Sequence, residues 1–295
     1  MQSFIKRFVF LTLMITIVIF AGDLEDGDNA YRSQDYQSAH TYYLKVAEQG
    51  NAEAQYKLAK ILYYNLGVDD NKKEAIQWYE KAAFQGYIDA QVSLGKIYHE
   101  GKGFFTLANN DQAMNLFKKA ATNGSSEAEC MIGIMYRDGD GVADNLQEAM
   151  KWFKISAAKN NACAQFNLGY MFSSGNDNVP INHRLAMDWY LKAAKQGEPS
   201  SLNNIGIMFA RGKGVMQDYS IAHALFNLAA ASGYKYNNDA DDEEEILEDD
   251  DKSREYVNMR IADAQVNEAI SYARNPDKLW KVIDEVRNVS FTNVK

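Results

Sequence analysis

Residues 49–58, QGNAEAQYKL, and residues 78–83, WYEKAA, open and close one unit of a pattern that recurs along the chain. When the residues that correspond to Gly50 are placed in one column, the column recurs every 36 to 38 residues, with members Gly50, Gly86, Gly124, Asn160, Gly197 and Gly233. Self-similarity at this period is typical of solenoids, in which short units stack on one another. The sequence therefore predicts one repeat array.

The first part of each unit predicts a helix with one apolar face. In the first unit, Ala54, Leu58, Ala59 and Leu62 lie at positions i, i+4, i+5 and i+8, which fall on one side of a helix. The third of these positions holds only small residues, namely Ala59, Gly95, Gly133, Gly169 and Gly206. A small residue there lets the backbone of a second helix approach closely.

A turn and a second helix complete the unit. Several units carry Gly-x-Gly, as at residues 101–103, 139–141 and 212–214, which suits the left-handed backbone at the end of a helix. The second helix places an alanine before an aromatic pair, as in Ala75, Trp78 and Tyr79. Because one such pair of helices cannot bury its apolar face alone, we expect an all-α fold, a right-handed α-solenoid of stacked antiparallel helix pairs.

The two quoted motifs resemble the Sel1-like repeat, a relative of the tetratricopeptide repeat, and the resemblance extends over roughly residues 30–233. It implies a non-enzymatic scaffold for protein–protein interaction, of bacterial type, with an assembly, regulatory or host-contact role. The partner it implies is another protein or a peptide segment.

The pattern divides the chain into five regions. Residues 8–20 are an apolar run behind Lys6 and Arg7, which predicts that residues 1–21 are a signal peptide or, if uncleaved, a membrane anchor. We expect an N-terminal capping helix in residues 22–49, five repeats in 50–233, a disordered acidic loop in 234–252 and capping helices in 253–295. The leader predicts export to the periplasm or the extracellular space, and we expect a monomer.

Charge is concentrated in one tract. The chain has 31 Lys and Arg against 40 Asp and Glu, a net charge of −9, and residues 239–251 hold ten of the acidic residues, so the remainder sums to +1. A nearly neutral body lacks the basic surface that nucleic acid requires, so we expect no nucleic-acid partner. We expect membrane contact only through the N-terminal segment.

Motifs for catalysis and metal binding are weak. Ser93 and Lys96, like Ser156 and Lys159, match S-x-x-K, but the S-D-N and K-T-G partner motifs are absent, so a β-lactamase-like or peptidoglycan hydrolase is the alternative function. The acidic residues from Asp138 to Asp144 resemble a calcium loop, but its sixth position is Ala143 and not the glycine that such a loop requires. The sequence also has no Cys and His residues at the spacing of a zinc site. We expect no enzyme activity, no cofactor and no metal.

The two cysteines fall in different columns. Cys130 shares its column with apolar residues such as Val92, whereas Cys163 shares its column with acidic residues such as Glu127. We therefore expect Cys130 to be buried and Cys163 to face solvent, which disfavours a disulfide between them.

In solenoids of helix pairs the first helices line the concave face, so first-helix positions opposite the core are the candidate binding residues. Lysines dominate these positions in the first two units, and apolar residues occur in the third to fifth. We predict a groove for an extended or helical segment of another protein, lined by Lys57, Lys60, Tyr64, Lys96, Glu100, Met131, Ile134, Asn167, Tyr170, Asn204, Ile207 and Arg211.

Overall fold

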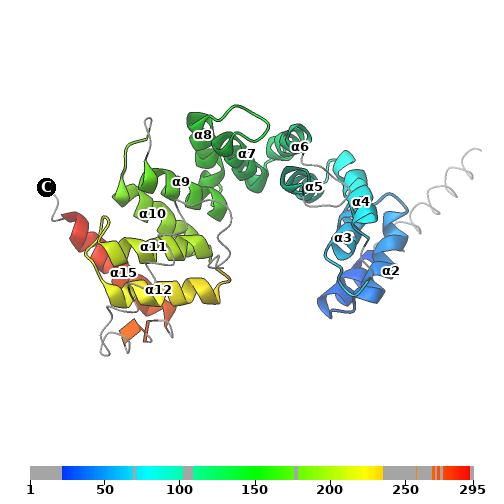
Figure 1. Cartoon of the computed structure of the whole chain (residues 1–295). Helices are drawn as coiled ribbons and strands as arrows, with labels where there is room; N and C mark the ends of the chain where they lie inside the picture. The colour runs from blue at the N-terminus through cyan, green and yellow to red at the C-terminus, as the bar shows by residue number, and fades with distance from the viewer. Residues whose placement is uncertain are drawn as a thin grey trace, which may run out of the picture. The chain divides into compact units, whose positions relative to one another are not determined.

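The structure, a computed structural model, describes residues 22–68, 71–101, 109–175, 179–234, 257, 268, 269, 271, 272 and 275–292. Two compact units, Met1–Asn145 and Leu146–Lys295, divide the chain (Figure 1). The predicted leader, nearly all of the acidic loop and much of the first C-terminal capping helix lie outside the described residues.

The first unit consists of helices arranged in pairs. Residues 22–32 are helical. The helices that follow are α2 (Tyr36–Ala47), α3 (Ala52–Tyr63), α4 (Lys72–Phe84), α5 (Ile88–Glu100), α6 (Asn110–Thr122) and α7 (Ser126–Asp138). Within this unit each helix contacts the next one along the chain, from the α2–α3 contact to the α6–α7 contact. Antiparallel packing of consecutive helices is thus the basic element of the unit, as the repeat pattern predicts.

The second unit continues the same order. Its helices are α8 (Leu146–Ala158), α9 (Ala162–Ser174), α10 (His183–Ala194), α11 (Pro199–Arg211), α12 (Tyr219–Ala231) and α15 (Pro276–Thr292). Each helix from α8 to α12 contacts the next. Within the described ranges the regular secondary structure is helical, which confirms the prediction of an all-α solenoid built from helix pairs.

Helix ends follow the turn chemistry of the sequence. Gly101, Gly139 and Gly212 end α5, α7 and α11 in the left-handed conformation. Such a backbone is available to glycine at little cost. At the other end of a helix, the side chain of Asn51 accepts a hydrogen bond of 2.9 Å from the backbone N–H of Ala54 and caps α3.

The small column places helices in close contact. A Cβ atom added at Gly95 in α5 would lie 2.6 Å from Cε1 of Phe117 in α6, and one added at Gly206 in α11 would lie 2.6 Å from Cε1 of Phe226 in α12. Both phenylalanines are buried. The aromatic ring of the second helix therefore occupies the space that the first helix leaves by lacking a side chain.

Buried glutamines connect neighbouring repeats, a feature that the sequence reasoning missed. The Gln55 amide in α3 donates to the backbone carbonyl of Ala47 at 3.0 Å, and the Gln91 amide in α5 donates to that of Ala83 at 3.2 Å. Each bond gives a second donor to a carbonyl at the end of the preceding second helix, which also accepts from the backbone N–H of Gly50 or Gly86.

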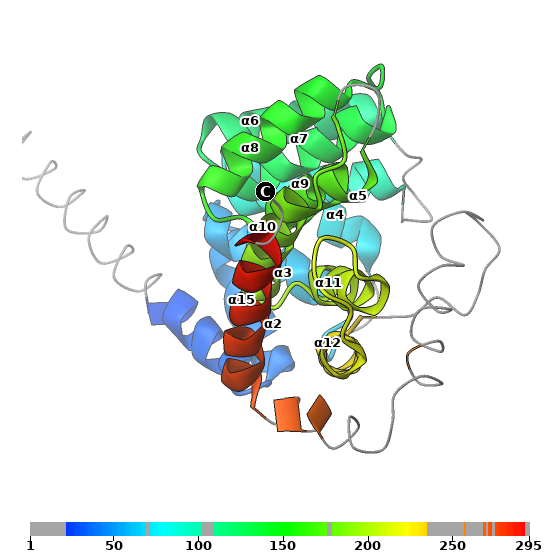
Figure 2. The ribbon, with the colours of Figure 1, turned by 90° about the vertical axis from the view of Figure 1, so that its left-hand side faces the viewer.

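The C-terminal helix α15 packs onto the second unit. Leu279 and Ile283 are fully buried in one cluster with residues of α10, α11 and α12. Arg287 makes an ion pair of 3.0 Å with Asp188 of α10. Figure 2 shows α15 beside these helices. The apolar face of this C-terminal segment is thus buried against the repeat helices.

The expectation that Cys130 is buried is confirmed, since none of its surface is exposed. The expectations that Cys163 faces solvent and that a disulfide is disfavoured were wrong, because Cys130 and Cys163 are both disulfide-bonded. The argument from the columns failed because Cys163 is half-buried rather than turned to solvent. The amide of Asn167, one turn further along α9, donates to the backbone carbonyl of Cys163 at 2.9 Å.

Candidate functional site

First helices of the first unit lie side by side. The Tyr56 ring of α3 lies 5.2 Å from the ring of Tyr87, which precedes α5, and Lys96 of α5 makes an ion pair with Glu127 of α7. These contacts join three consecutive first helices into one surface. The candidate residues on it are the half-buried Lys57, Lys60, Lys96, Met131 and Ile134 and the exposed Tyr64 and Glu100.

In the second unit, the candidate residues are more deeply placed. Asn167 of α9 is buried, with 3% of its surface exposed. Tyr170 of α9 and Ile207 of α11 are half-buried and pack against the core cluster of this unit. Asn204 and Arg211 of α11 are also half-buried. Part of this predicted stripe thus contributes to the core of the unit.

Lys57 is held by two carboxylates. Its ammonium lies 2.7 Å from Oδ1 of Asp28 and 2.6 Å from Oε1 of Glu53. The hydroxyl of Tyr43 also donates to Asp28, at 2.7 Å. Burial opposes ionisation of Asp28, but the hydrogen bonds from Lys57 and Tyr43 outweigh it and lower the pKa of this carboxyl. The Lys57 charge therefore ties residues 22–32 to α3.

A hollow of about 200 Å³ lies beside this cluster. Helical residues 22–32, α2 and α3 all contribute to its wall, which is formed by Asp28, Tyr31, Arg32, Tyr43, Tyr56, Lys57 and Lys60. Four of the seven come from the segment predicted to be only a cap, so the sequence reasoning missed them. The available signal was the spacing of Asp28, Tyr31 and Arg32, which places them on one helical face.

Tyr56, which lies in the wall of the hollow, packs against two tyrosines that are not part of the wall. The Tyr56 ring lies 5.2 Å from that of Tyr87 and 5.9 Å from that of Tyr79, centroid to centroid. Burial is the main cause that raises the pKa of all three phenols above the ordinary value, so they stay neutral at physiological pH. Neutral rings of this kind offer aromatic faces together with hydroxyl groups.

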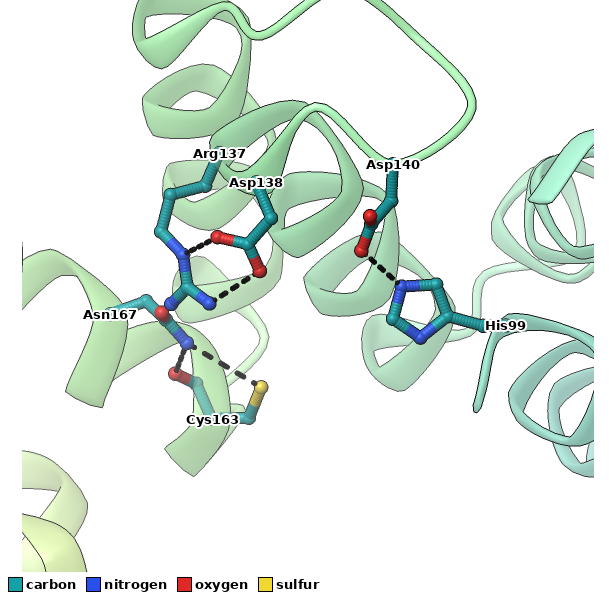
Figure 3. A network of polar contacts seen from close by, with 6 residues as sticks. All are labelled: His99, Arg137, Asp138, Asp140, Cys163 and Asn167. Atoms are coloured by element: carbon teal, nitrogen blue, oxygen red, sulfur yellow. Dashed lines mark hydrogen bonds and ion pairs between the residues drawn. The ribbon is translucent and has the colours of Figure 1, made fainter. Parts of the chain in front are cut away.

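The acidic residues that weakly suggested calcium have other partners. In Figure 3, His99 Nε2 lies 2.8 Å from Asp140, and Arg137 makes two hydrogen bonds to Asp138. Among the described residues, no group of three His, Cys, Asp or Glu side chains could hold a metal ion.

The Ser-x-x-Lys motifs are engaged differently from a nucleophile and its base. The Lys96 ammonium pairs with the Glu127 carboxylate of α7. Ser156 in α8 is fully buried.

In the part of the chain that the structure describes, no helix is both long and apolar enough to cross a membrane.

The period, the helix pairs and the surface of first helices define an α-solenoid repeat protein. The family model described as Sel1 repeat matches residues 22–51, 52–87, 88–125, 126–161, 164–198 and 199–234, which together exceed half of the chain. The chain belongs to the Sel1 repeat family. Six segments match, and the first of them coincides with the region where a capping helix was expected. Sel1 repeats commonly form scaffolds for protein interaction.

Two of the solved structures that are similar to this chain cover most of its length. One is c5321, a protective antigen present in uropathogenic Escherichia coli strains, with 27% identity, a TM-score of 0.71 and coverage of 92% of this chain but 55% of its own. The other is a Sel1 repeat protein from Oxalobacter formigenes, with 24% identity, a TM-score of 0.65 and coverage of 81% and 100%, which shows the fold alone. This chain thus spans about half the length of the E. coli protein. No curated protein matches it.

Proposed function

We propose that this protein is a non-enzymatic scaffold that binds a segment of another protein on the surface of its first helices. The observation that carries the proposal is the joining of α3, α5 and α7 into one surface in the first unit, through the Tyr56–Tyr87 ring contact and the Lys96–Glu127 ion pair. That surface presents partly exposed apolar side chains, Met131 and Ile134, together with Tyr64, of which 60% is exposed. Apolar groups among charged ones are typical of surfaces that bind proteins.

The charged residues of this surface have different roles in the proposal. Lys57 and Lys96 are occupied by Asp28, Glu53 and Glu127, so they hold the surface together. Lys60 has no carboxylate within ion-pairing distance among the described residues, and its ammonium lies 5.8 Å from the centroid of the Tyr31 ring. Lys60 is therefore the lysine we assign to partner contact, together with Tyr64 at the end of α3 and the apolar pair on α7.

We place the protein in the cell envelope or outside the cell. This part of the proposal rests on the leader-like sequence of residues 1–21, with two basic residues before an apolar run.

Capture of the partner from the native envelope fraction, followed by mass spectrometry, tests the proposal. Two variants of the full chain act as bait beside the wild type, Lys60→Glu and the pair Met131→Gln with Ile134→Gln. We expect each variant to reduce capture of the same protein at least fivefold, because charge complementarity and apolar burial both contribute to recognition.

The matched control is Lys73→Glu with Lys118→Glu, which reverses exposed charges on the second helices α4 and α6. It should capture the partner like the wild type, and circular dichroism should show equal helicity for all four baits. Undiminished capture by both surface variants would contradict the proposal.

A further inference from the structure

We propose that the hollow between residues 22–32, α2 and α3 is a binding site for the carboxylate of an acidic side chain in an extended peptide segment of the partner. The inference rests on the proposed function and names the chemistry that this part of the surface recognises. The wall of the hollow combines aromatic rings with two cations, Arg32 and Lys60, that have no ion-pair partner among the described residues. Lys57 and Lys96, by contrast, are paired with carboxylates.

The charges of the wall decide the sign of the ligand. Asp28 is neutralised by Lys57 and already accepts the Tyr43 hydroxyl, so it has little capacity left for a cationic ligand. Arg32 donates from Nε to the backbone carbonyl of Asp28 at 3.3 Å, and its charge helps to lower the pKa of the Asp28 carboxyl. The Lys60 ammonium lies 5.8 Å from the centroid of the Tyr31 ring. Among the described residues, neither cation lies within ion-pairing distance of a carboxylate. Two cationic heads therefore remain available, and carboxylates make charge-assisted hydrogen bonds to such groups.

The size of the hollow limits what enters it. At about 200 Å³ it is smaller than the roughly 300 to 1,000 Å³ of typical small-molecule sites, and it suits one side chain rather than a cofactor. Tyr31 and Tyr56 contribute aromatic surface to the same wall. An Asp or Glu beside an apolar or aromatic residue matches this combination, because the carboxylate reaches the cations while its neighbour covers a ring.

A polymeric anion fits the surface less well. Binding of nucleic acid or of an acidic polysaccharide depends on many cations spread along a surface. Here the neighbouring lysines are paired, with Lys57 bound to Asp28 and Lys96 to Glu127. The remaining cations can therefore bind one anionic group but not a chain of them. These observations favour a single carboxylate in a peptide.

Fluorescence anisotropy with the full chain tests this site. The probes are fluorescein-labelled nonapeptides that carry Glu or Asp at the centre, flanked by Leu and Tyr, and matched nonapeptides with Gln or Asn at the centre. We expect the acidic probes to bind at least tenfold more tightly than the amide probes. Raising the salt concentration from 50 to 500 mM should weaken their binding, because the cations are partly exposed.

Variants locate the binding to the hollow. Lys60→Met keeps the aliphatic stem and removes the charge, and Arg32→Gln does the same for the second cation. Each should weaken the acidic probe about tenfold, as expected for a lost charge-assisted hydrogen bond, and leave the amide probe unchanged. Lys60→Arg should restore binding. Lys118→Met on α6 is the matched control and should bind like the wild type.

The outcomes separate this inference from the proposed function. Equal binding of acidic and amide probes, or unchanged binding by both charge variants, overturns the carboxylate site. The scaffold proposal survives that result if Met131→Gln with Ile134→Gln still loses the native partner. Competition of a DNA oligonucleotide or inorganic phosphate with the acidic probe at equal concentration also overturns the inference, since the site would then bind anions generally.

Discussion

Gly95 illustrates how one residue sets the distance between two helices. Its Cα faces the ring of Phe117, which is fully buried, and a methyl group at Gly95 would lie 2.6 Å from Cε1, 2.9 Å from Cδ1 and 3.0 Å from Cζ. Because three ring atoms are in the way, rotation of a flexible side chain end cannot relieve the clash. Either the ring or the helix must move.

Gly95→Ala should therefore destabilise the first unit, because overpacking a core costs about 1–3 kcal/mol. The gain in helix propensity that alanine gives, about 1 kcal/mol, offsets part of this cost, so we expect a net loss of up to about 2 kcal/mol. Urea unfolding followed by circular dichroism measures the change. The control is Asn115→Ala, an exposed position on α6, where we expect a change within about 0.5 kcal/mol. A Gly95→Ala variant as stable as the wild type would show that the helices separate freely here.

The sequence predicted the structural role of Gly95, but it did not predict the role of residues 22–32. The small column could be recognised because every unit repeats it, and the structure explains it by close helix contact at Gly95 and Gly206. Residues 22–32 could not be assigned a binding role in the same way. The hollow depends on side chains from three helices that meet only after folding, and on the pairing of Lys57 with Asp28, 29 residues earlier in the chain.

Helix α15 shows how an amphipathic element is used when no further repeat follows it. Its apolar residues Leu279 and Ile283 are buried against α10, α11 and α12, while Asp284 and Arg287 make ion pairs with Lys195 and Asp188. The ion pairs are partly exposed, and such pairs contribute little stability. Burial of the leucine and isoleucine is therefore the main stabilising contribution of this helix.

Leu279→Ala should lower the stability of the second unit by about 2–5 kcal/mol, the range for truncation of a buried leucine. Hydrogen exchange followed by mass spectrometry should show faster exchange in α10 to α12, because these helices share the core with Leu279. Lys281→Ala changes an exposed position on the same helix and should leave exchange unchanged. Equal protection in Leu279→Ala would mean that α15 contributes no stability to the unit.

For the whole molecule, periodicity predicted the helix pairs from Ala52 to Ala231, because stacked units must repeat the same contacts. It did not predict the disulfide state of Cys130 and Cys163. Equivalent positions in the repeats show whether a side chain is typically buried or exposed, but they do not give the orientation of one particular side chain. Nor did periodicity show that Lys57 pairs with Asp28 or that Lys96 pairs with Glu127, because these two carboxylates lie on other helices.

The central claim is that the surface of first helices binds another protein, and site-specific photo-crosslinking in the native cells tests it most directly. A photoreactive residue replaces the exposed Tyr64 in one strain and the exposed Lys118 of α6 in another. We predict that position 64 crosslinks to one discrete protein, that Lys60→Glu in the same chain abolishes the crosslink, and that position 118 does not form it. A crosslink to that protein from position 118 but not from position 64 would contradict the account.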